Sequence, residues 1–197
     1  MKPDEIKEIR DAIEKELTGK RFEHTLGVAY TAALLAECND YSSETALLAG
    51  LLHDCAKCYS DQKLINICKK NNVELTETEL KNTALLHGKA GAVVAKRKYK
   101  IADEDILNAI KYHTTGRPNM TVLEKIIYVA DYIEPGRNQV PNLSSLRKLA
   151  FQNLDAALIQ ILENIVNYLK SDGKETDPST EKTYEYYLNL QKSEAKQ

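Results

Sequence analysis

No stretch of this 197-residue sequence approaches the roughly 20 consecutive apolar residues that a helix needs to cross a bilayer. The first residues, MKPDEIKEIRDAIEKEL, are charged throughout and lack the apolar core of a secretory signal peptide. We therefore expect a cytoplasmic protein with no membrane partner.

The sequence also lacks an excess of charge of either sign. Its 27 Lys and Arg residues face 29 Asp and Glu residues, which gives a formal net charge of −2. A chain so balanced has no overall field to attract nucleic acid, so we expect no nucleic-acid partner. An anionic substrate would have to be met by individual Lys and Arg side chains.

Cysteine is scarce, and its pattern is incomplete for a zinc or redox site. In a cytoplasmic protein the four cysteines (Cys38, Cys55, Cys58 and Cys68) should be reduced thiols. Cys55 and Cys58 form a CxxC motif, but there is no second CxxC or CxxH to complete a structural zinc site. The motif also closes a helix, whereas a thioredoxin-like motif follows a strand and opens a helix. We expect a structural or incidental role for this pair.

What the sequence has in abundance is helical periodicity, and no segment alternates apolar and polar residues as a strand would. We find no internal repeat and no linker, so the sequence predicts one all-α domain. The expected helices cover residues 3–17, 20–38, a segment starting at Ser43, 61–71, 77–86, 88–99, 103–112, 121–133, 144–169 and a segment starting at Pro178. Ser43 is the expected cap of the third helix, Thr121 and Glu124 form a capping box, and SDGKETDP is an expected loop.

Six polar residues occupy core-facing positions of these helices, with apolar neighbours three or four residues away. They are His24, His53, Asp54, His87, His113 and Asp131. One buried histidine usually finds a partner in the core, but six buried polar groups would need six partners. A divalent metal satisfies them together, and nitrogen and oxygen ligands suit iron, manganese, cobalt or zinc. The sequence therefore predicts an open, octahedral, catalytic metal centre inside a helical bundle.

Basic residues accompany these candidate ligands. Lys57 lies one helical turn after His53, where it needs an anion between itself and the metal. Each of the other four ligand segments, around His24, His87, His113 and Asp131, also has a basic residue nearby in sequence. These are Arg21, Lys89, Arg117 and Arg137. Because guanidinium groups bind phosphate in a bidentate manner, the pattern favours a phosphate-rich substrate.

Five segments, in order, carry a resemblance to a known family: RFEHTLGV, LLHDCAK, LLHG, HTTGRPNM and VADYIEPGRN. The His…His-Asp…Asp pattern resembles the HD superfamily of metal-dependent phosphohydrolases, and the five segments together closely resemble the bacterial YqeK-type HD proteins. The resemblance runs from about residue 20 to the C-terminal helix. It implies a single HD domain over residues 1–197, with a core of about residues 20–140 and C-terminal helices, residues 141–197, that close the nucleotide site.

The resemblance implies an activity: symmetrical hydrolysis of diadenosine tetraphosphate and related dinucleoside polyphosphates to two ADP. It implies one or two iron ions, with manganese, cobalt or nickel as substitutes, held by His24, His53, Asp54 and Asp131. His87 and His113 would hold a second metal or grip phosphates. The other expected substrate contacts are Arg21, Thr114, Arg137, Asp177, Pro178, Ser179 and Thr180.

We expect Asp54 and Lys57 to be the catalytic residues. In this reading a metal-bound hydroxide, oriented by Asp54, attacks an inner phosphorus. Lys57, Arg137 and the two histidines His87 and His113 offset the charge on the transferring group.

Several alternatives stay open from the sequence. The GYP segment expected of a cyclic-dinucleotide phosphodiesterase is absent, but other phosphorylated nucleotides could be the substrate. A di-iron oxygenase and a non-catalytic nucleotide-sensing metal protein are further alternatives. The apolar stripe of residues 144–169 could pack in the core or form the face of a homodimer.

Overall fold

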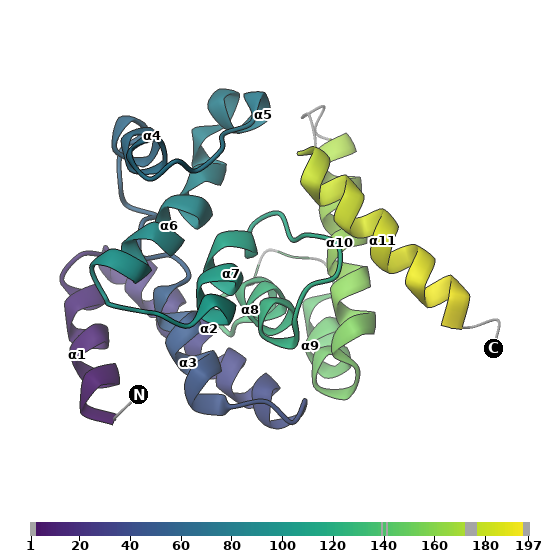
Figure 1. Ribbon diagram of the computed structural model, residues 1–197. Helices are drawn as coiled ribbons and strands as arrows, with labels where there is room; N and C mark the ends of the chain where they lie inside the picture. Colours follow the sequence, from purple (N-terminus) through teal and green to yellow (C-terminus); the bar gives the residue numbers. More distant parts are fainter. Residues whose placement is uncertain (1–2, 139, 141, 172–176, 195–197) are drawn as a thin grey trace.

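The computed structural model describes residues 3–138, 140, 142–171 and 177–194, and in these residues every regular element is helical (Figure 1). The elements are α1 (Pro3–Glu14), α2 (Gly19–Glu37), α3 (Ser43–Leu52), α4 (Asp61–Lys70), α5 (Glu77–Lys81), the 3-10 turn η1 (Thr83–Leu85), α6 (Leu86–Arg97), α7 (Glu104–Tyr112), α8 (Val122–Ile133), α9 (Leu143–Gln152), α10 (Leu154–Ser171) and α11 (Pro178–Glu194). The predicted all-α class is confirmed.

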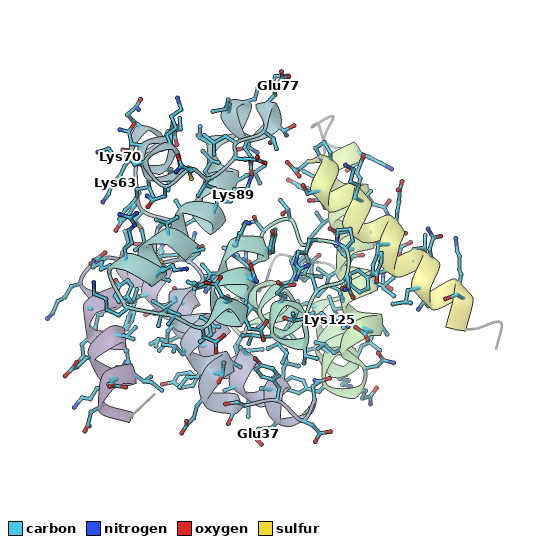
Figure 2. All side chains as sticks on the ribbon, in the orientation of Figure 1. Glu37, Lys63, Lys70, Glu77, Lys89 and Lys125 are labelled. Carbon is cyan, nitrogen blue, oxygen red and sulfur yellow. The ribbon has the colours of Figure 1, made fainter. Side chains whose placement is uncertain are left out.

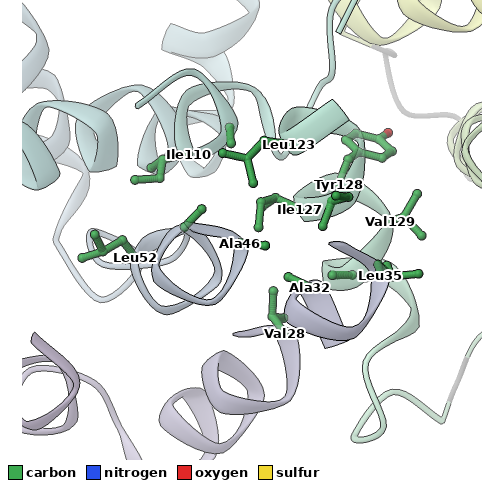
Figure 3. Close-up of a cluster of buried hydrophobic side chains, with 14 of the residues drawn as sticks. Val28, Ala32, Leu35, Ala46, Leu52, Ile110, Leu123, Ile127, Tyr128 and Val129 are labelled. Atoms are coloured by element: carbon green, nitrogen blue, oxygen red, sulfur yellow. The ribbon is translucent and has the colours of Figure 1, made fainter. Parts of the chain in front are cut away.

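The centre of the molecule is a bundle of α2, α3, α7 and α8, which pack against one another. Their inward faces meet in the cluster of Figure 3, whose labelled side chains include Val28, Leu35, Leu52, Ile110, Leu123 and Ile127. Helix α1 lies at one side of this bundle, and α9, α10 and α11 lie at the other (Figure 1). The polar residues singled out in the sequence come from the central bundle and from α6, which packs on α7.

One glycine sets how closely α2 and α3 approach. A Cβ added to Gly50 of α3 would stand 2.6 Å from the Cα of Ala29 in α2, a distance that real Cβ atoms essentially never show. The absence of a side chain therefore lets the two backbones touch. This close contact brings the end of α3, and with it His53, against α2.

The capping chemistry follows the sequence closely, with one correction. The capping box of Thr121 and Glu124 is present at α8. The third helix is capped by Ser42, not by Ser43 as predicted: the Ser42 side chain accepts a hydrogen bond from the backbone N–H of Thr45. Ser43 is already the first helical residue.

The predicted long helix of residues 144–169 is wrong, because the structure has two helices there. Asn153 is extended (φ −154°, ψ 99°) and separates α9 from α10. Its side-chain oxygen accepts a hydrogen bond from the N–H of Ala156 at 2.9 Å, so Asn153 ends one helix and caps the next. The stripe residues Leu154, Leu158 and Ile161 are buried in the main core.

Helix α11 is fastened to the loop that follows α7. The buried Tyr187 accepts a hydrogen bond from the backbone N–H of Met120 at 2.7 Å. The Thr183 hydroxyl lies 3.4 Å from the carbonyl of Thr115, and its methyl group fills the space beside Gly116. Gly116 has φ +65°, a conformation that suits glycine. Most of the predicted SDGKETDP loop, residues 172–176, lies outside the described residues.

No helix among the described residues is long and apolar enough to cross a membrane.

Candidate metal centre

The six polar residues predicted as ligands lie together where α2, α3, α6, α7 and α8 meet. His24 lies within α2, His87 in the first turn of α6 and Asp131 near the end of α8. The sequence analysis placed His53 and His113 on helices. In the structure they lie immediately after α3 and α7. At these ends the side chains leave their helices toward a common point, and Asp54 follows His53 in the turn.

Asp54 is the centre of the cluster. Its carboxylate is only 2% exposed, and it faces three histidines. Oδ1 lies 3.1 Å from Nε2 of His87 and 3.6 Å from Nε2 of His113, while Oδ2 lies 3.6 Å from Nε2 of His53. Arg21 donates a hydrogen bond to Oδ2 at 2.9 Å. A buried carboxylate surrounded in this way is suited to hold a cation together with its imidazole neighbours.

Hydrogen bonds fix the same tautomer in three of the histidines. Nδ1 of His53 contacts the carbonyl of Gly50 at 2.7 Å, and Nδ1 of His113 contacts the carbonyl of Ile110 at 2.7 Å. Nδ1 of His87 contacts the carbonyl three residues earlier in the same way. Because a carbonyl only accepts, each Nδ1 must carry the proton, and each Nε2 presents a lone pair toward Asp54.

His24 is oriented by a carboxylate instead. Its Nδ1 lies 3.0 Å from Oε1 of Glu134, and its Nε2 lies 3.1 Å from Oδ1 of Asp131. Glu134 is 3% exposed and also accepts a hydrogen bond from the N–H of Gly136 at 2.5 Å. A carboxylate behind the distal nitrogen of a ligating histidine is a common feature of metal sites. Sequence reasoning missed Glu134, although its place between a buried helix end and Pro135 set it apart from solvated glutamates.

The arrangement fits a divalent metal. One ligand atom each from His24, His53 and Asp131 lie within 4.8 Å of one another, and so do one each from His53, Asp54 and His113. Among the described residues Nε2 of His53 is fully buried and has no hydrogen-bond partner. Neighbouring ligands of an octahedral ion with bonds of about 2.1 Å stand roughly 3 Å apart, close to the 3.1 Å between His24 and Asp131.

The protonation states also suit a cation. Burial lowers the pKa of His53 to about 4, so the ring is neutral at neutral pH. Burial alone would raise the pKa of Asp54, but the surrounding histidines hold it well below its usual value. Burial likewise opposes ionisation of Asp131, yet the imidazole of His24, 3.1 Å from its Oδ1, lowers its pKa. Neutral imidazoles and ionised carboxylates are the forms that bind metals.

Three of the predicted cations reach the centre. Besides Arg21 at Asp54, Nη2 of Arg137 donates to Oδ1 of Asp131 at 2.8 Å. Nζ of Lys57 lies 3.3 Å from Nε2 of His87, and burial lowers the pKa of this lysine.

Two predicted cations are engaged elsewhere. Lys89, labelled in Figure 2, pairs with Glu79 of α5 at 2.7 Å. Arg117 pairs with Glu124 of the α8 capping box at 2.9 Å. Although both residues are close to the ligands in sequence, their charged groups pair with these glutamates and not with the site.

The remaining predicted substrate residues lie beside the cluster. Thr114 directly follows His113, and Asp177 caps α11 by accepting a hydrogen bond from the N–H of Ser179 at 2.8 Å. Asp177 and Thr180 are buried, whereas Pro178 and Ser179 are exposed. Thr114 and Ser179 line one groove of about 630 Å³. Among the described residues, therefore, the first turn of α11 lies next to the loop that follows the metal centre.

The cysteines take no part in this centre. All four are free thiols. Cys55 is buried with its Sγ 3.5 Å from the carbonyl of Gly91, and Cys58 is exposed.

An all-α bundle with histidines and aspartates clustered at its centre is the arrangement expected of a helical metal-binding protein. Comparison with known proteins identifies the family. The family model of the HD domain matches residues 21–136. This chain belongs to the HD-domain family.

Two named relatives and one solved structure are similar to most of this chain. A protein of Bacillus subtilis (strain 168) named symmetrical bis(5'-nucleosyl)-tetraphosphatase is 40% identical over 90% of this chain and 94% of its own length. A protein of the same name from Staphylococcus aureus (strain NCTC 8325 / PS 47) is 39% identical over 83% of this chain and 84% of its own. The crystal structure of a predicted HD superfamily hydrolase involved in NAD metabolism, from Clostridium acetobutylicum, superposes with a TM-score of 0.90 at 43% identity, covering 93% of this chain and 97% of that one.

Proposed function

We propose that this protein hydrolyses diadenosine tetraphosphate and related dinucleoside polyphosphates symmetrically, giving two ADP. The observation that carries the proposal is the buried Asp54, which faces three Nε2 lone pairs with Arg21 and Lys57 alongside. Such a centre offers ligands for a metal and cations for phosphate within one cluster of side chains. The names of the relatives in B. subtilis and S. aureus agree with it.

We assign the metal to His24, His53, Asp54 and Asp131, and we propose iron as the native ion, with manganese, cobalt or nickel as substitutes. Bound there, the ion would supply a water of lowered pKa as the nucleophile. Asp54 would help to hold the ion and would orient that water. His113 lies close enough to Asp54 to join the ligand set, at 3.6 Å. Metal content per chain distinguishes one ion from two.

We assign the phosphates to the cations Lys57, Arg137 and Arg21, with His87 beside them. The ammonium of Lys57 lies against Nε2 of His87, and a cation in that place favours a bound phosphate over a second metal there. Lys57 and Arg137 would offset the negative charge that spreads over the transferring phosphoryl group. ADP leaves as a phosphate anion of low basicity, so the site needs no strong general acid.

We propose that Thr114 and residues 177–180 close over the nucleoside, and that residues 1–197 form a single HD domain. We also propose a cytoplasmic enzyme with no nucleic-acid partner. A homodimer is an arrangement to be tested by light scattering on the purified protein. The stripe of α9 and α10 would not be its surface, because Leu154, Leu158 and Ile161 are buried within the chain.

The test is chromatography of the products formed from diadenosine tetraphosphate by the iron-loaded protein and by a chelated sample. Two ADP, lost on chelation and restored by iron, are the expected result. ATP with AMP would preserve a hydrolase but contradict attack at an inner phosphate. Tight nucleotide binding without turnover in the iron-loaded protein would instead support a nucleotide sensor.

A further inference from the structure

A groove of about 630 Å³ opens beside the metal centre, within the 300–1,000 Å³ usual for small-ligand sites. Its walls come from α6 and α7, from the turn after α4, from α5 and η1, and from the start of α11. In Figure 1, α5 and the start of α11 face each other at the top of the view, and each contributes a residue to the lining, Glu79 and Ser179. Apart from Thr114 and Ser179, its lining shares no residue with the site assigned above.

The groove begins where the metal centre ends. Thr114 lines the groove and follows His113, and Leu85 lines it two residues before His87. His87 and His113 both face Asp54, and their Nε2 atoms lie 3.0 Å apart. A molecule whose phosphates lie at Asp54 could therefore continue past this histidine pair into the groove.

The charges of the groove do not suit phosphate. Lys89 is paired with Glu79 at 2.7 Å, and Lys96 is paired with Glu104 at 2.8 Å. Lys111 is the remaining lysine of the lining, and its ammonium lies 4.8 Å from the centre of the Tyr112 ring. With its cations already engaged, the groove offers little attraction to an anion, in contrast to the metal centre.

The other lining groups suit a nucleoside. Val93 and Leu107 supply apolar surface, and Asn72 and Asn108 supply amides. In the part of the chain that the structure describes, neither amide has a side-chain hydrogen bond. An apolar wall with a few unpaired polar groups is the usual composition of a small-molecule site, and amides pair with the edges of bases.

We propose that this groove binds the second nucleoside of a dinucleoside polyphosphate, the one beyond the nucleotide held at Thr114 and residues 177–180. The inference rests on the proposed function and extends it, since such a groove would favour a substrate with a nucleoside at both ends. The polyphosphate would cross the His87–His113 pair, with Arg21, Lys57 and Arg137 on its charged part. Asn108, which is half-buried on α7, would hydrogen-bond the second base.

Two variants test the groove. Val93→Trp fills it from α6, and Asn108→Ala removes an amide without adding bulk. Each is compared with wild type for the KM of diadenosine tetraphosphate and for inhibition by adenosine 5'-tetraphosphate, which carries one nucleoside. The matched control is Leu149→Trp, which makes the same kind of change in a separate groove of about 340 Å³ between α9 and α10.

We expect Val93→Trp to raise the KM by about tenfold, the scale of one lost base contact, and Asn108→Ala to raise it by a smaller factor. The inhibition constant of adenosine 5'-tetraphosphate should stay within about twofold of wild type, which also shows that the variants are folded. An unchanged KM in both variants, or an equal rise in both constants, would overturn the inference while leaving the proposed function intact. A wild-type protein that cleaves no dinucleoside polyphosphate would overturn both.

Discussion

The carboxylate of Glu134 lies 3.0 Å from Nδ1 of His24, on the side of the ring opposite to Asp131. Glu134 is 3% exposed and lies behind the ring, away from the proposed metal position. It holds the His24 proton on Nδ1 and leaves Nε2 to face the proposed metal position. Glu134 is thus a positioning residue rather than a ligand.

Glu134→Gln should lower the affinity for the metal by about 10- to 100-fold, the usual effect of losing such a partner. A neutral amide is a weaker acceptor for the imidazole N–H, and it can also turn its NH2 group toward the ring. Competition against a chromophoric chelator measures the affinity directly, without reference to activity. Glu185→Gln, an exposed position on α11, is the matched control. Equal affinities in the two variants would remove Glu134 from the metal centre.

Gly27→Ala should weaken metal binding through the same carboxylate. A Cβ at Gly27 would stand 2.6 Å from Oε2 of Glu134, so Glu134 must move and its contact with His24 must change. Gly19→Ala is an unusually close control, because it makes the same substitution in the same helix with nothing within 4 Å of the new atom. Alanine at position 19 should leave metal affinity unchanged. If both variants bind metal like wild type, the packing of Gly27 against Glu134 has no role in the site.

His53→Ala and Asp54→Ala should each lose both bound metal and hydrolysis. His53 contributes the buried Nε2 that has no other partner among the described residues, and Asp54 contributes the central carboxylate. Metal content by mass spectrometry, with circular dichroism to verify folding, checks this expectation. Cys58→Ser, an exposed change in the same turn, should retain metal and activity. Retained activity in a folded His53 or Asp54 variant would contradict the assigned site.

Arg137→Ala should mainly raise the KM for the nucleotide, by about tenfold, if its guanidinium binds phosphate in the ground state. The arginine now pairs with Asp131 and is 42% exposed, so it is free to turn toward an incoming anion. Arg137→Lys should recover only part of the loss, because an ammonium cannot make the bidentate contact. Steady-state kinetics with Arg97→Ala as control separates this role from a general loss of surface charge. A fall in kcat at constant KM would assign Arg137 to the transition state alone.

The ligand cluster was predictable because burial and charge conflict visibly in the sequence. Asp54 and Asp131 follow apolar runs, where an unpaired carboxylate is strongly disfavoured, and this conflict indicates a cation. The helices around them were predictable for a related reason, since one-sided apolar periodicity alone defines a buried helical face.

The failures share a different cause: they depend on what lies opposite in space. Lys89 is two residues from His87, yet it forms an ion pair with Glu79 of α5. Asn153 breaks the predicted long helix without breaking its apolar stripe, because Leu154 and Leu158 continue into the core on the next helix. The role of Glu134 requires the close approach of Gly27, which lies on another helix and more than a hundred residues earlier.

The attachment of α11 offers a stability test that is independent of the metal centre. Tyr187→Phe keeps the buried ring but leaves the N–H of Met120, 2.7 Å from the lost hydroxyl, without its acceptor. Leaving one buried donor unsatisfied costs about 1–3 kcal/mol. In a chain of this size the midpoint of thermal unfolding should fall by about 2–4 °C per kcal/mol.

Tyr186→Phe is the matched control, because this neighbouring tyrosine is only partly buried and, among the described residues, its hydroxyl has no hydrogen-bond partner. Its melting temperature should match that of wild type. Because Met120 closes the loop that begins at His113, Tyr187→Phe should also raise the KM for the nucleotide if α11 helps to close the site. A lower melting temperature with an unchanged KM would mean that the tyrosine secures the fold but that residues 177–180 do not depend on it for binding substrate.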